Sequence, residues 1–164
     1  MSVKGKVWKY GDDVNTDVIF PGKYTYTIKE RSDMAKVALE DLDMEFNKNA
    51  KPGDIIVGGK NWGCGSSREQ AVSCIKERGI AVIIAKSFAR IYYRNCFNEG
   101  LPIIVCPEAV DAISMGDEVE VDFESGVIIA GGKEFKFPAY PEFVQGLIKD
   151  GGLIPHVKKS LGLA

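Results

Sequence analysis

Residues 54–106 decide the fold: DIIVGGKNWGCGSSREQAVSCIKERGIAVIIAKSFARIYYRNCFNEGLPIIVC. Short apolar runs alternate here with stretches of helical pattern, and the connections between them are short. The predicted elements are strands at 54–59, 80–85 and 101–106 and helices at 68–78 and 87–100. The run 80–85 is apolar throughout, which is typical of a strand buried on both faces. Strands that alternate with helices in this way predict an α/β fold around a parallel sheet.

The N-terminal flank adds two predicted elements. Residues 3–9 are predicted to form a short strand, and 10–27 form a polar stretch punctuated by Gly and Pro. Apolar residues recur at helical spacing over 32–40, which predicts a helix with Ser32 as its N-cap. These elements lead into the α/β core through the turn at Pro52-Gly53.

The C-terminal flank has a different sequence pattern. From residue 116 onward, polar and apolar residues alternate between Gly-rich turns, which favours a small antiparallel β lobe. A helical stretch is predicted from about Pro141, broken at Gly151-Gly152. The chain has 164 residues and no long linker, so we expect a single domain over 1–164.

Composition limits the class of function. The chain is 45% hydrophobic and 27% charged with a net charge of −2, as in ordinary soluble domains. No apolar run approaches the ~20 residues of a membrane span. The first ten residues lack the apolar core of a signal peptide, so we expect a cytoplasmic protein. The net negative charge argues against a broad nucleic-acid-binding surface.

The four cysteines do not form a metal motif. They lie 10, 22 and 10 residues apart, at Cys64, Cys74, Cys96 and Cys106. Zinc sites use C-x-x-C pairs and iron–sulfur proteins use closely spaced cysteines, and neither pattern is present. We therefore expect small buried thiols in a reducing compartment, and no metal held by this chain alone.

The segment Gly58–Gln70, GGKNWGCGSSREQ, is the candidate site. It joins a buried strand to a helix, at the strand edge where ligands bind in parallel sheets. Two overlapping patterns predict capping boxes, namely Ser66-x-x-Glu69 and Ser67-x-x-Gln70. Free backbone N–H groups at a helix N-terminus favour an anion, and Arg68 could clamp a carboxylate or phosphate. The plainer alternative is a capping serine beside a solvated arginine.

Familiar nucleotide and hydrolase motifs are absent from this segment. It lacks the P-loop pattern, and Arg68 stands where the third glycine of a dinucleotide fingerprint would be. Neither serine lies in G-x-S-x-G. The only histidine, His156, lies far along the chain and is expected to be structural. A self-contained catalytic triad is therefore not indicated.

Two motifs carry a family resemblance. GSSREQA at 65–71, followed by GIAVIIAKSFARIYYRNCFNEGLPII at 79–104, resembles the swivelling domain of the aconitase superfamily. GKVWKYGDDVNTDVIFPGKY at 5–24 is similar to the opening of 3-isopropylmalate dehydratase small subunits. The resemblance implies the β/β/α swivel fold, with a parallel sheet core and a small antiparallel lobe. It also implies a partner large subunit that holds a four-iron four-sulfur cluster, in a heterodimer or heterotetramer.

The resemblance also implies an activity, namely a hydro-lyase of leucine biosynthesis. Such an enzyme interconverts 2- and 3-isopropylmalate, small dicarboxylates, by loss and re-addition of water. By its place in the motif, Ser66 would be the general base that takes a proton from carbon. Gly65, Ser67 and Arg68 would bind substrate, with Arg68 on a carboxylate. Gln70 replaces the histidine more common in the family, but it keeps the capping spacing.

A second predicted substrate-binding segment follows Pro21-Gly22. In the family this loop faces the variable substituent of the substrate, and it comprises Lys23, Tyr24, Thr25 and Tyr26 here. Members that act on tricarboxylates tend to have an arginine after the tyrosine, and this chain has none, which favours an apolar substituent. Alternatives are a dehydratase for 2,3-dimethylmalate, 2-methylmalate (citraconate) or homoaconitate, or a non-catalytic anion-binding module.

The predicted helix 87–100 also carries a basic and aromatic group of residues. These are Lys86, Arg90, Tyr92, Tyr93 and Arg94. Arginine with large aromatics is the composition of protein interfaces, so the group is interpreted as core plus partner-docking surface.

Overall fold

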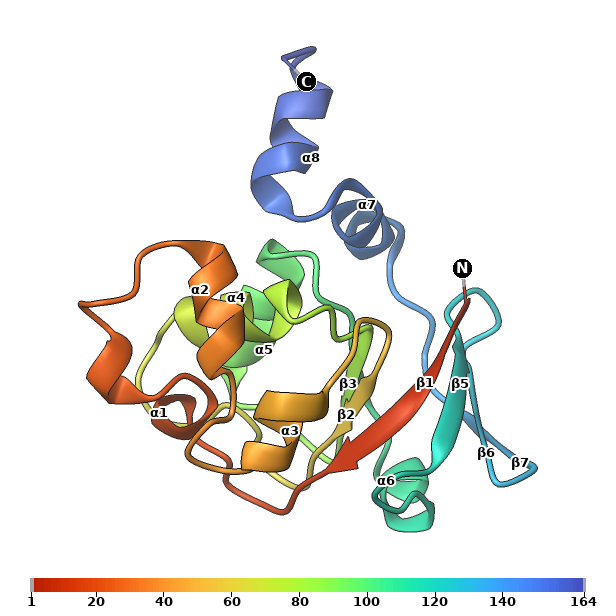
Figure 1. Cartoon of the computed structure of the whole chain (residues 1–164). Coiled ribbons are helices and arrows are strands. Elements are labelled where there is room, and N and C mark those ends of the chain that lie inside the picture. Colours follow the sequence, from red (N-terminus) through yellow and green to blue (C-terminus); the bar gives the residue numbers. More distant parts are fainter. Residues whose placement is uncertain (1, 164) are drawn as a thin grey trace.

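A single mixed sheet organises the chain in the computed structural model, which describes residues 2–163. Within that range the sheet has seven strands in the order β4-β3-β2-β1-β5-β6-β7 (Figure 1). The strands are β1 (Ser2–Lys9), β2 (Ile55–Val57), β3 (Val82–Ala85), β4 (Ile103–Val105), β5 (Glu118–Asp122), β6 (Val127–Ala130) and β7 (Lys133–Lys136). Strands β1 to β4 are parallel, and β5 to β7 continue the sheet antiparallel. The predicted α/β fold with a parallel core is confirmed.

Strand β1 joins the two halves of the sheet. Its first part, residues 2–6, pairs antiparallel with β5, and its last part, residues 7–9, pairs parallel with β2. The antiparallel β lobe predicted from the alternation after residue 116 is therefore present, and it extends the main sheet. The sequence alone indicated only a short strand here, without this central position.

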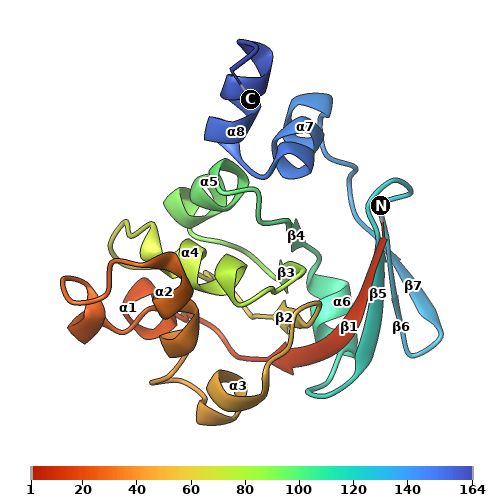
Figure 2. The same cartoon turned by 45° about the horizontal axis from the view of Figure 1, so that its top comes forward.

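Helices cover both faces of the parallel strands. They are α1 (Thr16–Ile19), η1 (Gly22–Tyr24), α2 (Arg31–Val37), α3 (Met44–Asn49), α4 (Gln70–Glu77), α5 (Arg90–Asn98), α6 (Pro107–Ala112), α7 (Glu142–Asp150) and α8 (Leu153–Ser160). Helices α4 and α5 lie on one face of the sheet, with α1 and α2 beyond α4, and α6 lies on the other face (Figure 2). Helix α3 lies beside β1, where Phe46 packs on Trp8.

The core confirms that β3, within the predicted run 80–85, is buried on both faces, and β2 is buried in the same way. In β2, Ile56 packs into the cluster under α4 and α5, while Ile55 and Val57 pack into the cluster under α6 and the antiparallel strands. All three are fully buried. In the described residues, Cys74, Cys96 and Cys106 are buried as expected, whereas Cys64 is partly exposed.

Several predicted helix starts are wrong by one to three residues. Helix α2 begins at Arg31 with Glu30 as N-cap, so Ser32 lies inside the helix and does not cap it. Helix α4 begins at Gln70 and not at 68, and α5 begins at Arg90. The predicted break of the C-terminal helix is confirmed, because Gly151 and Gly152 have φ of +86° and +131°.

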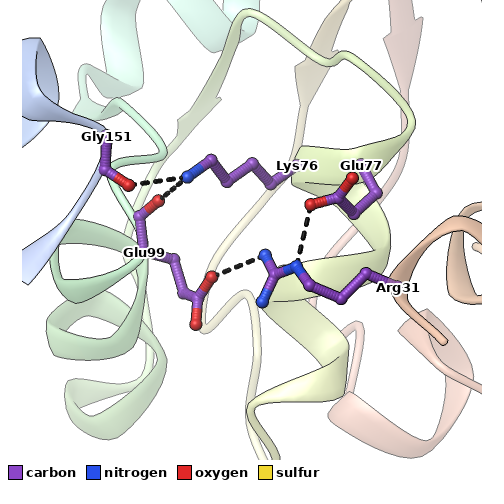
Figure 3. Close-up of polar contacts among 5 residues, drawn as sticks. All are labelled: Arg31, Lys76, Glu77, Glu99 and Gly151. Carbon is purple, nitrogen blue, oxygen red and sulfur yellow. Dashed lines mark hydrogen bonds and ion pairs between the residues drawn. The ribbon is translucent and has the colours of Figure 1, made fainter. Parts of the chain in front are cut away.

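Polar contacts fix the C-terminal ends of α4 and α5 (Figure 3). The Arg31 guanidinium donates to Glu77 and to Glu99, each at 2.8 Å. Lys76 Nζ donates to the carbonyl of Gly151 at 2.8 Å and to the carbonyl of Glu99. Helices α2, α4 and α5 and the α7–α8 junction are thus tied together. The N-terminal ends of α4 and α5, which border the site described next, are held in a fixed relation.

No helix within residues 2–163 has the length and apolarity needed to cross a bilayer.

Candidate functional site

A cavity of about 160 Å³ lies between the loop before α4 and the start of α5. Its lining combines backbone of the glycine-rich loop, four hydroxyl-bearing residues, two arginines and an amide. The lining residues are Thr16, Gly63, Gly65, Ser66, Ser67, Arg68, Ala89, Arg90, Ile91, Tyr92 and Asn95. The cavity therefore brings together the predicted residues Gly65 to Arg68.

The N-terminal segment holds the loop in place. Gly63 N donates to the carbonyl of Val14 at 2.8 Å, and Thr16 N donates to the carbonyl of Cys64 at 2.9 Å. The Thr16 hydroxyl donates to the carbonyl of Ser66 at 2.8 Å. The loop that carries the serines is thus fixed through its backbone, which leaves the serine side chains out of these contacts.

Gly63 permits the close approach of the loop to α5. Its φ is +82°, and a Cβ on this residue would lie 2.2 Å from Cγ of Tyr92. Tyr92 is fully enclosed, and its hydroxyl donates to the carbonyl of Ala71 at 3.0 Å. Burial raises the pKa of Tyr92 well above its usual range, so the ring is a neutral wall of the cavity.

The predicted capping boxes are wrong. Helix α4 has Glu69 as N-cap and receives no side-chain hydrogen bond there. Ser66 and Ser67 lie in the loop ahead of the helix and are exposed. Neither hydroxyl contacts a hydrogen-bond partner within the described part of the chain, so both are available to a ligand in the cavity.

Arg68 connects the two predicted segments. Its Nη1 donates to Oγ1 of Thr25 at 2.7 Å, and its Nη2 pairs with Oδ1 of Asp17 at 2.8 Å. The loop after Pro21-Gly22 is therefore brought to the serine loop, as the resemblance implied. Asp17 was not among the predicted site residues, although it lies in the N-terminal motif that carries the resemblance.

The other predicted residues of that loop are directed elsewhere. Tyr24 donates its hydroxyl to Glu40 at 2.8 Å, and this hydrogen bond raises the Tyr24 pKa. Lys23 Nζ lies 3.6 Å from carboxylate oxygens of Glu40 and Asp41. Tyr26 is 89% exposed. None of these three lines the cavity, so only Thr25 contacts another site residue directly.

Sequence analysis missed the contribution of α5. Arg90, Ile91 and Asn95 line the cavity from this helix. The signal was available, because α5 starts directly after a parallel strand, at the sheet edge where ligands bind. Tyr92, part of the group interpreted as core plus partner-docking surface, belongs to the core and is buried against the serine loop. Lys86 of that group pairs with Asp111 at 2.8 Å.

The cysteines do not fit a metal cluster. No three His, Cys, Asp or Glu side chains within residues 2–163 lie together as metal ligands. Burial raises the pKa of the Cys74 and Cys96 thiols, which disfavours the thiolate form that binds metal. His156 lies in α8 and contacts Asp150 at 2.7 Å, as expected for a structural histidine.

Comparison with known proteins adds to this geometry. Residues 13–108 match the model of the aconitase C-terminal domain. The chain is 55% identical to the 3-isopropylmalate dehydratase small subunit of Caldicellulosiruptor bescii, over 98% of each chain. It is 51% identical to the 2,3-dimethylmalate dehydratase small subunit of Eubacterium barkeri, over 96% of this chain and 97% of the relative.

A solved structure agrees. The crystal structure of 3-isopropylmalate dehydratase from Methanocaldococcus jannaschii superposes with a TM-score of 0.93 at 42% identity, covering 99% of this chain and 97% of that chain. The swivelling-domain fold expected from the serine motif is thereby confirmed. The chain belongs to the aconitase C-terminal domain family, among the small subunits of 3-isopropylmalate dehydratases, which are hydro-lyases that work with a large subunit.

Proposed function

We propose that this chain completes the active site of a hydro-lyase that interconverts 2- and 3-isopropylmalate in leucine biosynthesis. The observation that carries the proposal is the pair of unpartnered hydroxyls, Ser66 and Ser67, beside Arg68 at one cavity. The names of the relatives supply the reaction class. The whole chain, 1–164, acts in this proposal as one swivel domain in the cytoplasm.

Ser66 is proposed as the base. Ser66, as its alkoxide, takes the proton from one carbon of the substrate, and the C–H electron pair forms the alkene. The hydroxyl on the neighbouring carbon leaves with the C–O electron pair and, with the proton passed on from Ser66, departs as water. Re-addition of water to the other carbon of the alkene gives the isomer. A serine hydroxyl is a very weak base, so its anion has to be stabilised by preorganised N–H groups and cations in a dry site. We propose that backbone N–H groups of the glycine-rich loop, together with Arg68, do this in the same cavity.

Gly65, Ser67 and Arg68 are proposed to bind substrate. A guanidinium pairs with a carboxylate through parallel hydrogen bonds, and this fixes orientation as well as charge. Thr25 and Asp17 hold the guanidinium of Arg68 in one direction. Lys23, Tyr24 and Tyr26 can contribute only if the loop turns toward the cavity when the enzyme is assembled.

The large subunit is proposed to hold the four-iron four-sulfur cluster. Its role would be that of a Lewis acid for the leaving hydroxyl. The names of the small-subunit relatives imply a large-subunit partner. We propose that the two chains form a heterodimer or a heterotetramer. The exposed cavity residues Ser66, Ser67 and Arg90 suit a site that closes between two chains.

A second candidate substrate is 2,3-dimethylmalate. The Eubacterium barkeri relative, whose name gives this substrate, is nearly as similar as the isopropylmalate relatives. Both acids carry an apolar substituent, in keeping with the absence of arginine from positions 25–27. A third carboxylate, as in homoaconitate, would lack a cation there.

The test is anaerobic reconstitution with the cognate large subunit, followed by alkene absorbance. The substrates compared are 3-isopropylmalate, 2,3-dimethylmalate, 2-methylmalate and homoaconitate. Ser66→Ala is expected to lower kcat about 10³-fold, the usual effect of removing a general base. Ser114→Ala, an exposed serine between α6 and β5, is the matched control and should keep full activity. Full activity of Ser66→Ala would show that another residue is the base. Inactivity of the wild-type complex on all four acids would favour the non-catalytic anion-binding module.

A further inference from the structure

We infer that Arg90, at the start of α5, binds one carboxylate of the dicarboxylate substrate, while Arg68 binds the other. This inference rests on the proposed function, because it names the group that receives the second charge of the same substrate. Nothing in the sequence motif of the serine loop assigns a role to Arg90.

The charge of the cavity lining supports two carboxylate sites. Arg68 and Arg90 are the charged residues among the lining residues, and both are cationic. They come from two different segments, Arg68 from the serine loop and Arg90 from α5. The positive end of the α5 dipole lies on the same wall as Arg90 and favours an anion further. A substrate with two negative charges would neutralise both arginines.

The two arginines differ in what already holds them. Arg68 uses both terminal nitrogens on protein groups, Thr25 and Asp17. The side chain of Arg90 is exposed and makes no ion pair or hydrogen bond with any described residue. Arg68 is therefore prepared in one orientation, whereas Arg90 is a cation whose partner has to come from outside the chain.

The nearest cations on the same element do not share this position. Lys86, ahead of α5, is paired with Asp111. Arg94, one turn further along α5, is exposed but does not line the cavity. Arg94 therefore serves as the matched control, with the same charge on the same helix outside the site.

The experiment uses the reconstituted enzyme at saturating large subunit, with Arg90→Gln, Arg90→Lys and Arg94→Gln. Loss of a charged hydrogen-bond partner is expected to raise the KM of Arg90→Gln about 10- to 100-fold with kcat retained. Arg90→Lys should recover part of this loss, because it keeps the charge but not the planar fork. Arg94→Gln should keep the wild-type KM, because Arg94 does not line the cavity and any weaker docking of the partner is overcome at saturating large subunit.

A binding measurement makes the inference independent of turnover. Succinate and its half-amide, succinamate, are titrated calorimetrically into the wild-type and Arg90→Gln complexes. The wild type should prefer the dicarboxylate, and Arg90→Gln should lose most of that preference. An unchanged preference of Arg90→Gln for succinate over succinamate would overturn the inference. Absence of hydro-lyase activity in the complex would instead overturn the proposed function, and the binding measurement can still be made in such a complex.

Two kinetic outcomes would also overturn it. A fall in kcat at constant KM would mean that Arg90 acts on the Ser66 hydroxyl and not on a carboxylate. Weaker association with the large subunit at unchanged KM would make Arg90 an interface residue.

Discussion

Arg68 and Asp17 form an ion pair that joins the serine loop to the N-terminal segment at the cavity. The arginine side chain is 24% exposed and the aspartate 59%, so solvent screens their attraction. The pair therefore adds little to folding stability, and its value lies in orientation. A guanidinium held in one direction loses less conformational freedom when a carboxylate binds.

Replacement of Asp17 tests this positioning role. Asp17→Asn removes the charge but keeps the shape, so Arg68 should become mobile. We expect a KM increase of about 10-fold, equivalent to about 1.4 kcal/mol, with the melting temperature unchanged. Asp33→Asn is the control, because Asp33 forms a surface ion pair with Lys36 within α2. An unchanged KM would show that Arg68 needs no such support.

Single residues also show where sequence reasoning stops. The pattern Ser66-x-x-Glu69 satisfies a capping box, yet the helix starts at Gln70 and the serine backbone is bonded to Thr16 instead. The hydrogen bond from Thr16, fifty residues away in the sequence, fixes the conformation of Ser66 in place of the local capping pattern. Tyr24 was placed in the substrate loop, but its hydroxyl finds Glu40, a contact that no motif encodes.

At the scale of elements, the serine loop depends on two glycines with positive φ and different surroundings. Gly63 has φ +82° and is packed against Tyr92, whereas Gly65 has φ +97° and its nearest neighbour would be 3.4 Å from a Cβ. Backbone strain is therefore common to both positions, and steric overlap is specific to Gly63.

Matched alanine substitutions separate these two effects. Gly65→Ala should lower the free energy of unfolding by about 1–2 kcal/mol, because alanine disfavours the left-handed conformation. Gly63→Ala should lower the free energy of unfolding by more than about 4 kcal/mol, because the new methyl group overlaps the ring of the buried Tyr92. Thermal melts of the two variants provide the comparison. Equal melting temperatures would mean that α5 shifts easily and that the cavity wall is not rigid.

The elements themselves were predictable where one local pattern decides them. Continuous apolar runs identified β2, β3 and β4, because each packs on both faces. The double pairing of β1 was not predictable, since its partners β2 and β5 lie about fifty and more than a hundred residues away. Short helices such as α3 and α6 were missed because six residues give too little periodicity.

At the scale of the whole molecule, the contacts of Arg31 and Lys76 tie together the C-terminal ends of α4 and α5 (Figure 3). The cavity lies toward the N-terminal ends of these two helices. Exposed apolar side chains accompany it there. Ile91 lines the cavity and is 54% exposed, and Tyr26, next to the Thr25 that binds Arg68, is 89% exposed. We expect the large subunit to cover these side chains in the complex proposed above. We therefore expect the large subunit to supply the rest of the binding site.

This view predicts how substrate binding depends on the partner. A cavity of about 160 Å³ is smaller than the ~300–1,000 Å³ of self-sufficient ligand pockets, and it buries only part of a ligand. Titration of 3-isopropylmalate into the isolated chain should therefore give a Kd weaker than about 1 mM, worth less than about 4 kcal/mol. The same titration into the complex with the large subunit should be at least about 10-fold tighter. Arg68→Gln in the complex should abolish the gain if the two chains share one site. Tight binding by the isolated chain would instead identify a complete anion-binding module, in which the large subunit contributes nothing to recognition.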